Sequence, residues 1–369
     1  MKKTLLLCGS ALLLGLCGCS SKVTNPVTTP AAIPTLRAYN GTASVGDFMT
    51  IAIDANAHTI HYDNHSNGDS ATVAYTVNSD GSYTLSDPTG NLVAAYEVPN
   101  FVMLIQATKT GPTHDVPSLI TAVQSAPISM ATIENHDYNY MQFRTAAGGI
   151  ELGSVAIDGV GNVNVSSYWP FGAMNGQTAF HNNQVNQTPF QPDSGGTFMR
   201  LPDGGGYDYV FGTPNGVFAV DTQNGAILSF IKAATKAFVA SNAGTYKAIF
   251  YHKTGAHTGA GNVETGTASQ GSGTILITST GDVTITDASS TLLAAGTLVP
   301  VADDTTLVGA GKLADPCNGL FTLRTTTSTS QQDVFCTFLN GAVLFSSYKA
   351  VLPLNSGNPY EYFYGCALK

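Results

Sequence analysis

Between Tyr168 and Pro192 the chain concentrates aromatic and amide side chains, the residue types that bind sugars and other small polar ligands. Rings stack on sugar faces, and amides and imidazoles hydrogen-bond to hydroxyl groups. The segment has no clear period, and long irregular segments are often functional. If the protein binds a small ligand, we expect the site here, with the only tryptophan at or beside it; the interpretation that we favour for the two rings is that Trp169 and Phe171 plug an open barrel end. The candidate residues are Tyr168, Trp169, Phe171, His181, Asn182 and Asn183.

A second group with possible chemistry is the run from His58 to His65, which holds three of the eight histidines. On a strand, His61, Asp63 and His65 would project from one face at alternate positions, as a metal site requires. Because no further ligand can be placed near them from the sequence, we expect a solvated face. We predict neither a metal site nor a cofactor.

Catalysis has one short candidate, the segment Asp193-Ser194-Gly195-Gly196. Over these four residues the chain resembles the nucleophile segment of trypsin-like serine proteases. Pro192 stands where that family has glycine, and no histidine lies in a matching context. A serine nucleophile needs a base within hydrogen-bond reach. We therefore read the segment as a turn and predict no catalytic residue.

Three cysteines follow the first 19 residues: Cys317, Cys336 and Cys366. An oxidising compartment allows one disulfide and leaves one thiol free. Cys336 lies in an apolar run and is expected to be a buried free thiol. Cys317 and Cys366 lie in turn-like surroundings, so we predict that they form the pair, although three pairings exist.

The elements that must position these groups are β-strands. After residue 40 apolar and polar residues alternate in short runs, the period of a half-buried strand. Seven Asn-Gly dipeptides punctuate the runs, and this pair favours the type I′ turn that joins antiparallel strands. The sequence therefore predicts an all-β protein built from hairpins.

The strand pattern repeats along the chain. Alternating apolar residues lie at matching offsets around Gly81, Gly161 and Gly281, which predicts equivalent turns. We expect about three degenerate units, covering residues 39–135, 136–240 and 241–369, each an antiparallel meander that closes as a barrel or packs as a sandwich. A β-propeller is the alternative fold, and convergent hairpins without duplication are the alternative explanation of the repeats.

The N-terminus has the features of an export signal. Lys2 and Lys3 precede an apolar run of twelve residues, Leu5 to Leu16. As a helix this run would span only about 18 Å, too short for a bilayer core of about 30 Å. The tetrapeptide that ends at Cys19, Leu-Cys-Gly-Cys, resembles the lipobox of bacterial lipoproteins. The resemblance implies a signal peptide over residues 1–18, lipidation of Cys19, and a cell-envelope location, the outer membrane if the host has one.

Residues 19–38 follow as a tether rich in proline and threonine, which we expect to be extended. The net charge is −9, and only 15 residues are lysine or arginine. Such a chain has no electrostatic footprint for nucleic acid. The partners we expect are therefore the lipid bilayer, through acylated Cys19, and a glycan or small molecule.

Together these observations predict a cell-envelope lipoprotein that acts as a non-catalytic surface binding module. One alternative is a structural component of the envelope or surface layer. The other is a secreted β-fold hydrolase, which would need two carboxylates roughly 5 to 10 Å apart in a cleft.

Overall fold

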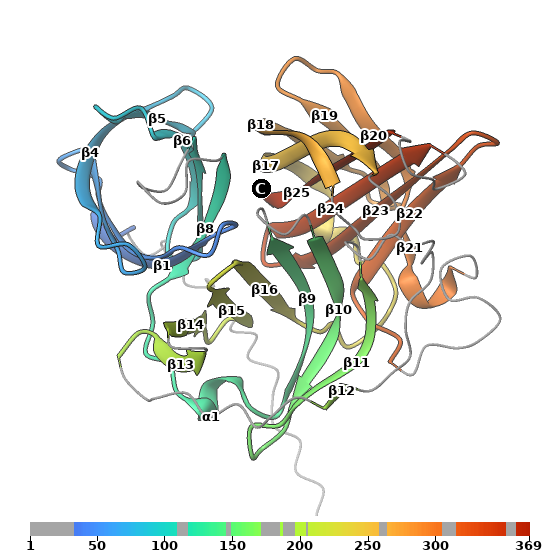
Figure 1. The fold of residues 1–369 in the computed structure, drawn as a ribbon, viewed down its shortest axis with the longest axis horizontal. Coiled ribbons are helices and arrows are strands. Elements are labelled where there is room, and N and C mark those ends of the chain that lie inside the picture. The colour runs from blue at the N-terminus through green and yellow to red at the C-terminus, as the bar shows by residue number, and fades with distance from the viewer. Residues whose placement is uncertain are drawn as a thin grey trace, which may run out of the picture. The chain divides into compact units, whose positions relative to one another are not determined.

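Antiparallel β-strands make up nearly all the regular structure of the described residues. A computed structural model of the protein describes residues 33–108, 117–144, 149–170, 185–186, 196–203, 206–257, 264–304, 315–351 and 359–369. From Pro34 to Lys369 the chain forms one compact unit that contains three sheets (Figure 1). The predicted fold class, all-β with antiparallel meander barrels, is confirmed. In the part that is described, no helix has the length and apolar character needed to span a membrane.

The first sheet is a closed eight-stranded barrel, seen almost along its axis in Figure 1. Each strand pairs with the next, and the last pairs with the first. One hydrophobic cluster takes residues from all eight strands, which only side chains facing the interior of a closed barrel can do. The strands are β1 (Leu36–Ala43), β2 (Phe48–Asp54), β3 (Thr59–Asn64), β4 (Ser70–Val77), β5 (Tyr83–Ser86), β6 (Leu92–Val98), β7 (Val102–Ala107) and β8 (Ser118–Gln124).

The second sheet has eight strands in the order β12-β11-β10-β9-β16-β15-β14-β13. A four-residue helix, α1 (Met130–Ile133), precedes it. Its strands are β9 (His136–Arg144), β10 (Gly149–Ile157), β11 (Val163–Pro170), β12 (Val185–Asn186), β13 (Met199–Asp203), β14 (Gly206–Thr213), β15 (Val217–Thr222) and β16 (Gly225–Ile231).

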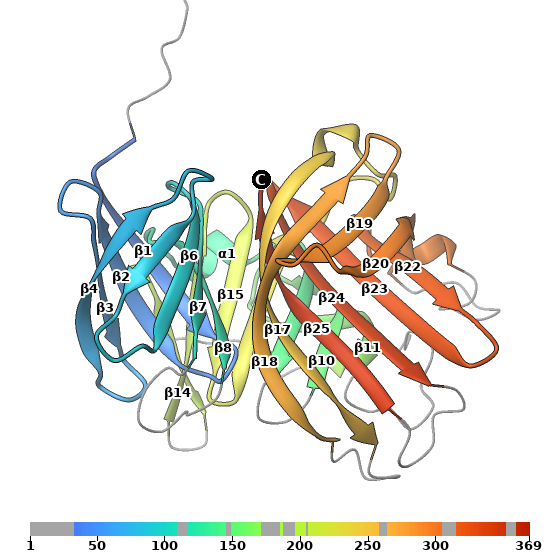
Figure 2. The ribbon, with the colours of Figure 1, turned by 90° about the horizontal axis from the view of Figure 1, so that it is seen from above.

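The third sheet has nine strands in the order β20-β19-β18-β17-β25-β24-β23-β22-β21, and Figure 2 shows its longest strands side by side. Two 3₁₀ turns, η1 (Ala240–Asn242) and η2 (Val301–Asp303), flank parts of it. The strands are β17 (Gly244–His257), β18 (Glu264–Ile277), β19 (Asp282–Asp287), β20 (Leu292–Thr297), β21 (Val299–Pro300), β22 (Leu320–Thr326), β23 (Ser330–Leu339), β24 (Ala342–Val351) and β25 (Pro359–Leu368).

All three sheets are meanders in which the first strand pairs with the last. β1 pairs with β8, β9 with β16, and β17 with β25. Blades of a propeller do not pair their first strand with their last in this way, so the propeller alternative is wrong. In the third sheet only Leu298 separates the two edge strands, β20 and β21, so that one continuous segment supplies both edges.

The glycine turns agree only in part with the predicted repeat. Gly161 and Gly281 have φ of 81° and 86° and both join the second and third strands of their sheets. Gly81, with φ of 82°, joins the fourth and fifth strands of the barrel. The prediction of three equivalent turns is therefore wrong for Gly81, because any tight hairpin that needs a positive φ selects glycine at this point.

Two further predictions need correction. The tether was expected to reach residue 38, but β1 begins at Leu36 and Arg37 is already buried. The predicted disulfide between Cys317 and Cys366 is not formed, since all three described cysteines are free and buried. Cys366 lies within β25, between its partners Ile249 and Leu344, and not in a turn as expected. The expectation that Cys336 is a buried free thiol is confirmed.

Candidate functional site

The residues predicted to bind a ligand are only partly described. Tyr168 and Trp169 belong to strand β11, paired with β10, and are therefore not part of an irregular segment as expected. Tyr168 is half-buried and packs against the hydrophobic cluster of the second sheet, as a core residue does. The side chain of Trp169 lies outside the described part of the structure, as do the residues Phe171, His181, Asn182 and Asn183. Their binding role therefore stays a prediction.

The histidine run forms an open polar surface. His61 Nε2 lies 3.4 Å from Asp63 Oδ2, with side chains about half exposed. The Ser70 hydroxyl donates to Asp63 (2.7 Å) and is the largest cause that holds the pKa of Asp63 below its ordinary value. Within the described ranges, no group of three or more histidine, cysteine, aspartate or glutamate side chains is arranged to hold a metal ion.

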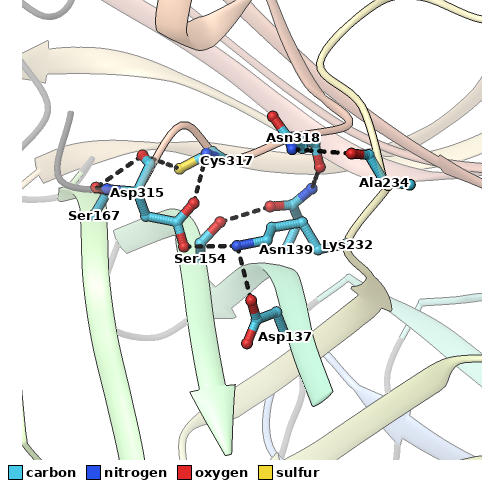
Figure 3. A network of polar contacts seen from close by, with 9 residues as sticks. All are labelled: Asp137, Asn139, Ser154, Ser167, Lys232, Ala234, Asp315, Cys317 and Asn318. Atoms are coloured by element: carbon cyan, nitrogen blue, oxygen red, sulfur yellow. Dashed lines mark hydrogen bonds and ion pairs between the residues drawn. The ribbon is translucent and has the colours of Figure 1, made fainter. Parts of the chain in front are cut away.

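Cys317 lies in a turn before β22 that connects the third sheet to the second through hydrogen bonds and ion pairs (Figure 3). Its backbone N–H donates to Asp315 Oδ1 (2.8 Å), and Lys232 Nζ lies 2.8 Å from the other oxygen of that carboxylate. The same lysine lies 3.0 Å from Asp137 Oδ2 on β9. Burial raises the pKa of Cys317 to about 12, so its thiol is not ionised at neutral pH and cannot act as a nucleophile.

Neutral hydrogen bonds complete this junction (Figure 3). Asn139 Nδ2 donates to the carbonyl of Asn318 (2.8 Å), and the Ser154 hydroxyl donates to Asn139 Oδ1 (2.7 Å). Ser167 accepts from the backbone N–H of Asp315 at 3.1 Å. Asn139 and Ser167 of the second sheet, and Lys232 just after it, therefore each bond to a residue of the turn, and the network is structural.

The interior of the third sheet is layered, and the layers follow from its register. Directly paired residues of neighbouring strands share a face, and residues two apart on a strand lie one layer apart. The innermost of three successive layers is apolar: Phe250, Gly271, Phe321, Cys336, Phe345 and Gly365. The next is mixed: His252, Ser269, Leu323, Val334, Ser347 and Phe363.

The third layer is entirely polar, and we call it the polar ring. Six neighbouring strands of the sheet each contribute one residue to it, in the order β18, β17, β25, β24, β23 and β22. Exposure increases toward this layer: Phe345 is buried, whereas Lys349 on the same strand is exposed. The polar ring therefore lies at an open end of the third sheet. Its members are Thr254, Thr267, Thr325, Gln332, Lys349 and Glu361.

Glu361 is the charged acceptor of the polar ring. His252 Nε2 lies 3.0 Å from Glu361 Oε1, and their side chains are 27% and 34% exposed. This hydrogen bond is the largest cause that lowers the pKa of Glu361, and the charge of Lys349 adds to it. Glu361 is therefore ionised at neutral pH and accepts the Nε2–H of His252. Within the described residues, His252 is its single side-chain hydrogen-bond donor, and the contact is made through Oε1.

A pocket opens beside this end of the sheet, between β20 and β22. Strands β21 and β22 pair at two positions, Val299 with Thr322 and Pro300 with Phe321. Beyond them the described parts of β20 and β22 are not paired, and a pocket of about 480 Å³ lies in the gap. Leu323 belongs to both the pocket and the mixed layer. The pocket is lined by Thr297, Val299, Asp303, Asp304, Leu323, Arg324 and Thr326.

The closed barrel contains a glutamate with a fully buried side chain, Glu97, in contrast to the partly exposed Glu361. Glu97 Oε1 accepts from Arg37 Nε (2.6 Å) and from the Tyr39 hydroxyl (2.5 Å). Its other oxygen accepts from Arg37 Nη2 (2.8 Å) and the Tyr83 hydroxyl (2.6 Å). The side chains of Arg37 and Glu97 are 5% and 0% exposed. Because Glu97 is sealed by four donors, it holds its barrel together, whereas Glu361 faces solvent with one donor.

Sequence reasoning missed the polar ring because its members span more than 100 residues and meet only through strand register. One signal was visible: in Tyr-Glu-Tyr-Phe-Tyr, residues 360–364, a charged residue takes a place in an otherwise aromatic alternation. The three tyrosines form a buried stack on the other face of β25, with ring centroids 5.9 and 6.3 Å apart. Glu361 is thereby directed to the interior of the sheet.

Comparisons with known proteins give no family for this chain. No protein-family model and no curated protein matches it. A variant of transferrin binding protein B from Haemophilus parasuis matches 91% of this chain and 76% of its own, at 8% identity and a TM-score of 0.21. Transferrin binding protein B from Neisseria meningitidis matches 87% and 66%, at 9% identity and 0.22. A protein of unknown function from Nostoc punctiforme matches 90% and 94%, also at 9% and 0.22. Similarities with TM-scores this low support no conclusion about function.

Proposed function

We propose that this protein is a lipid-anchored, non-catalytic binding protein of the cell envelope, and that the open end of its third sheet holds a glycan or small polar ligand. The polar ring is the observation that carries the proposal. Six neighbouring strands place a hydrogen-bonding side chain at one solvent-exposed level above an apolar interior. Ligand sites combine an apolar wall with a few convergent polar groups in this way.

The chemistry of the polar ring favours a ligand rich in hydroxyl groups. Glu361 supplies an ionised acceptor, and Lys349, its direct partner across β24 and β25, supplies a donor of opposite charge. Gln332 donates to the Leu293 carbonyl (3.0 Å) and to the Ser347 hydroxyl (3.1 Å), which fixes its amide in place. One negative and one positive group leave the ring without net charge, which suits a neutral sugar or polyol.

Two observations favour binding over the alternatives. A structural envelope component has no need of a ligand-sized hollow, whereas the pocket of about 480 Å³ exceeds the roughly 300 Å³ at which ligand pockets begin. Glycoside hydrolysis uses a pair of carboxylates, whereas the polar ring supplies one, Glu361. The two aspartates that line the pocket, Asp303 and Asp304, are adjacent in the chain, and Asp303 is ion-paired with Lys236. The envelope location and the lipid anchor depend on Cys19 and its lipobox, which lie outside the described residues.

The binding proposal is tested by Glu361→Gln, which removes the charge and keeps the shape. We would screen the full mature protein against a glycan array and a panel of free glucose, galactose and N-acetylglucosamine. For any neutral sugar or polyol found, the Glu361→Gln variant should bind at least tenfold more weakly, since a hydrogen bond to a charged group contributes about 1.5–3 kcal/mol. Asp63→Asn, an exposed carboxylate of the barrel, is the matched control and should bind as the wild type does. Equal binding by both variants would refute the site.

A further inference from the structure

A second surface with binding chemistry lies on the outer face of β13 and β14, and we call it the aromatic patch. It consists of Phe198, Arg200, Tyr207 and Tyr209, with His65 from the turn after β3. Arg200 is directly paired with Tyr209, so the two side chains share one face of the sheet. Exposure falls along β14 on this face: Tyr207 is 45% exposed, Tyr209 is half-buried and Phe211 is buried.

Three rings of the aromatic patch, those of Phe198, Tyr209 and His65, are held by contacts with one another and with Phe48. The buried ring of Phe48 stacks on Tyr209 with centroids 4.4 Å apart and planes 9° apart. Phe198 packs against the same Phe48 ring at 4.8 Å, and His65 lies 5.7 Å from Phe198. His65 Nε2 is 3.0 Å from the Thr50 hydroxyl. An aromatic surface ordered in advance loses little conformational entropy when a ligand binds.

Arg200 gives the aromatic patch its charge. Its guanidinium lies 5.6 Å from the centroid of the Tyr207 ring, and it forms no ion pair with any described residue. Burial lowers the pKa of His65, and the nearby charge of Arg200 acts in the same direction, so His65 is neutral at pH 7. Asp63, whose charge acts on His65 in the opposite direction, is itself engaged by His61 and Ser70. A cation that lacks a carboxylate partner is therefore presented beside an exposed ring, on a chain whose net charge is −9.

We propose that the aromatic patch binds acidic sugars of the uronic acid class. The sugar face would stack on Tyr207, and its carboxylate would pair with Arg200, whose planar guanidinium suits bidentate recognition of a carboxylate. This site is distinct from the polar ring, which carries no net charge and is formed by other strands. It goes beyond the proposed function, because it adds a second ligand class with its own residues.

The probe is trigalacturonate. Its methyl ester has nearly the same shape but no carboxylate charge, and it serves as the control ligand. Titration calorimetry on the full mature protein should show the acid binding at least tenfold more tightly than the ester. Arg200→Gln should remove that preference, because a charged hydrogen bond accounts for about a tenfold difference or more. Tyr207→Ala should weaken both ligands, whereas Tyr207→Phe, which keeps the ring, should bind both as the wild type does.

Glu361→Gln separates this inference from the proposed function. It should leave trigalacturonate binding unchanged, whether or not the polar ring binds a ligand. The inference is wrong if trigalacturonate does not bind, if the acid and the ester bind equally well, or if Arg200→Gln keeps the preference for the acid. A melting temperature equal to that of the wild type for Arg200→Gln and Tyr207→Ala, both exposed positions, shows that the binding changes do not come from unfolding.

Discussion

Thr42 on β1 donates a hydrogen bond to the carboxyl group of Asp221 on β15, and this contact joins the closed barrel to the second sheet. Asp221 is 1% exposed. Burial raises the pKa of Asp221 well above its ordinary value, and the neighbouring carboxyl groups of Asp47 and Asp208 act in the same direction. Asp221 therefore holds its proton at pH values at which the unfolded chain has lost it.

Replacement of Asp221 by asparagine should remove a pH dependence of stability. Above about pH 4 the native state binds this proton and the unfolded state does not, so the free energy of unfolding falls by up to about 1.4 kcal/mol per pH unit until the native carboxyl ionises. Below that pH both states are protonated and the contribution is constant. Asp221→Asn keeps an acceptor for Thr42 and cannot ionise. Urea unfolding from pH 5 to pH 8 should show a flatter profile and a more stable protein at pH 7; a profile with the wild-type slope would contradict this assignment.

The buried ion pair between Arg37 and Glu97 in the closed barrel should be essential for stability. Arg37→Met leaves the charge of Glu97 buried without its cation, and breaking a buried pair in this way costs about 3–5 kcal/mol. Chemical denaturation measures the loss. Lys247→Met is the matched control, because its ion pair with Asp80 is 35% and 48% exposed and such pairs contribute less than about 1 kcal/mol. Equal losses in the two variants would show that the barrel does not depend on Arg37.

The described cysteines should behave as three unreactive thiols. Burial raises the pKa of Cys317 and Cys336 to about 12 and also raises that of Cys366, so few thiolates form at pH 8. Iodoacetamide should label none of them in the native protein. After unfolding without reductant it should label all three, as peptide mass spectrometry can show. Recovery of a peptide pair joined through Cys317 and Cys366 would show that these two cysteines form a disulfide, contrary to this prediction.

Membrane association should depend on Cys19. The lipobox and the proline-rich segment after it motivate this prediction. A Cys19→Ser protein should lose palmitate labelling and leave the membrane fraction. Cys336→Ser, which removes a buried thiol from the third sheet, is the matched control and should keep both. A Cys19→Ser protein that still labels and sediments with membranes would disprove the anchor.

Local patterns in the sequence predicted the strands and turns of this fold. Alternation predicted half-buried strands, and the turn between β23 and β24 has the expected geometry, with positive φ at both Asn340 (47°) and Gly341 (84°). The Asn-Gly dipeptide at Asn40 does not form a turn. Asn40 lies inside β1, because this strand pairs with β2 on one side and β8 on the other. Tertiary pairing overrode the local preference there.

The polar ring and the aromatic patch could not be predicted, because each exists only after register is set. Thr254 and Glu361 are more than 100 residues apart and become neighbours through the pairing of β17 with β25. Arg200 meets His65 only when the barrel and the second sheet pack together. A one-residue shift in either register would turn these side chains to the opposite face. The residue types were visible in the sequence, whereas their shared face was not.

At Leu298 the chain passes from one edge strand of the third sheet, β20, to the other, β21. The seam between β21 and β22, meaning the line along which these two strands pair, is shorter than every other seam of this sheet. Along it the wall is joined by two residue pairs only, and Pro300 has no N–H to donate to its partner. The seam between β17 and β25, in contrast, runs over ten pairs. Separation of β21 from β22 therefore breaks the fewest backbone hydrogen bonds of any seam in the sheet. Hydrogen exchange should therefore be fastest there, and this is the position at which the sheet should open first.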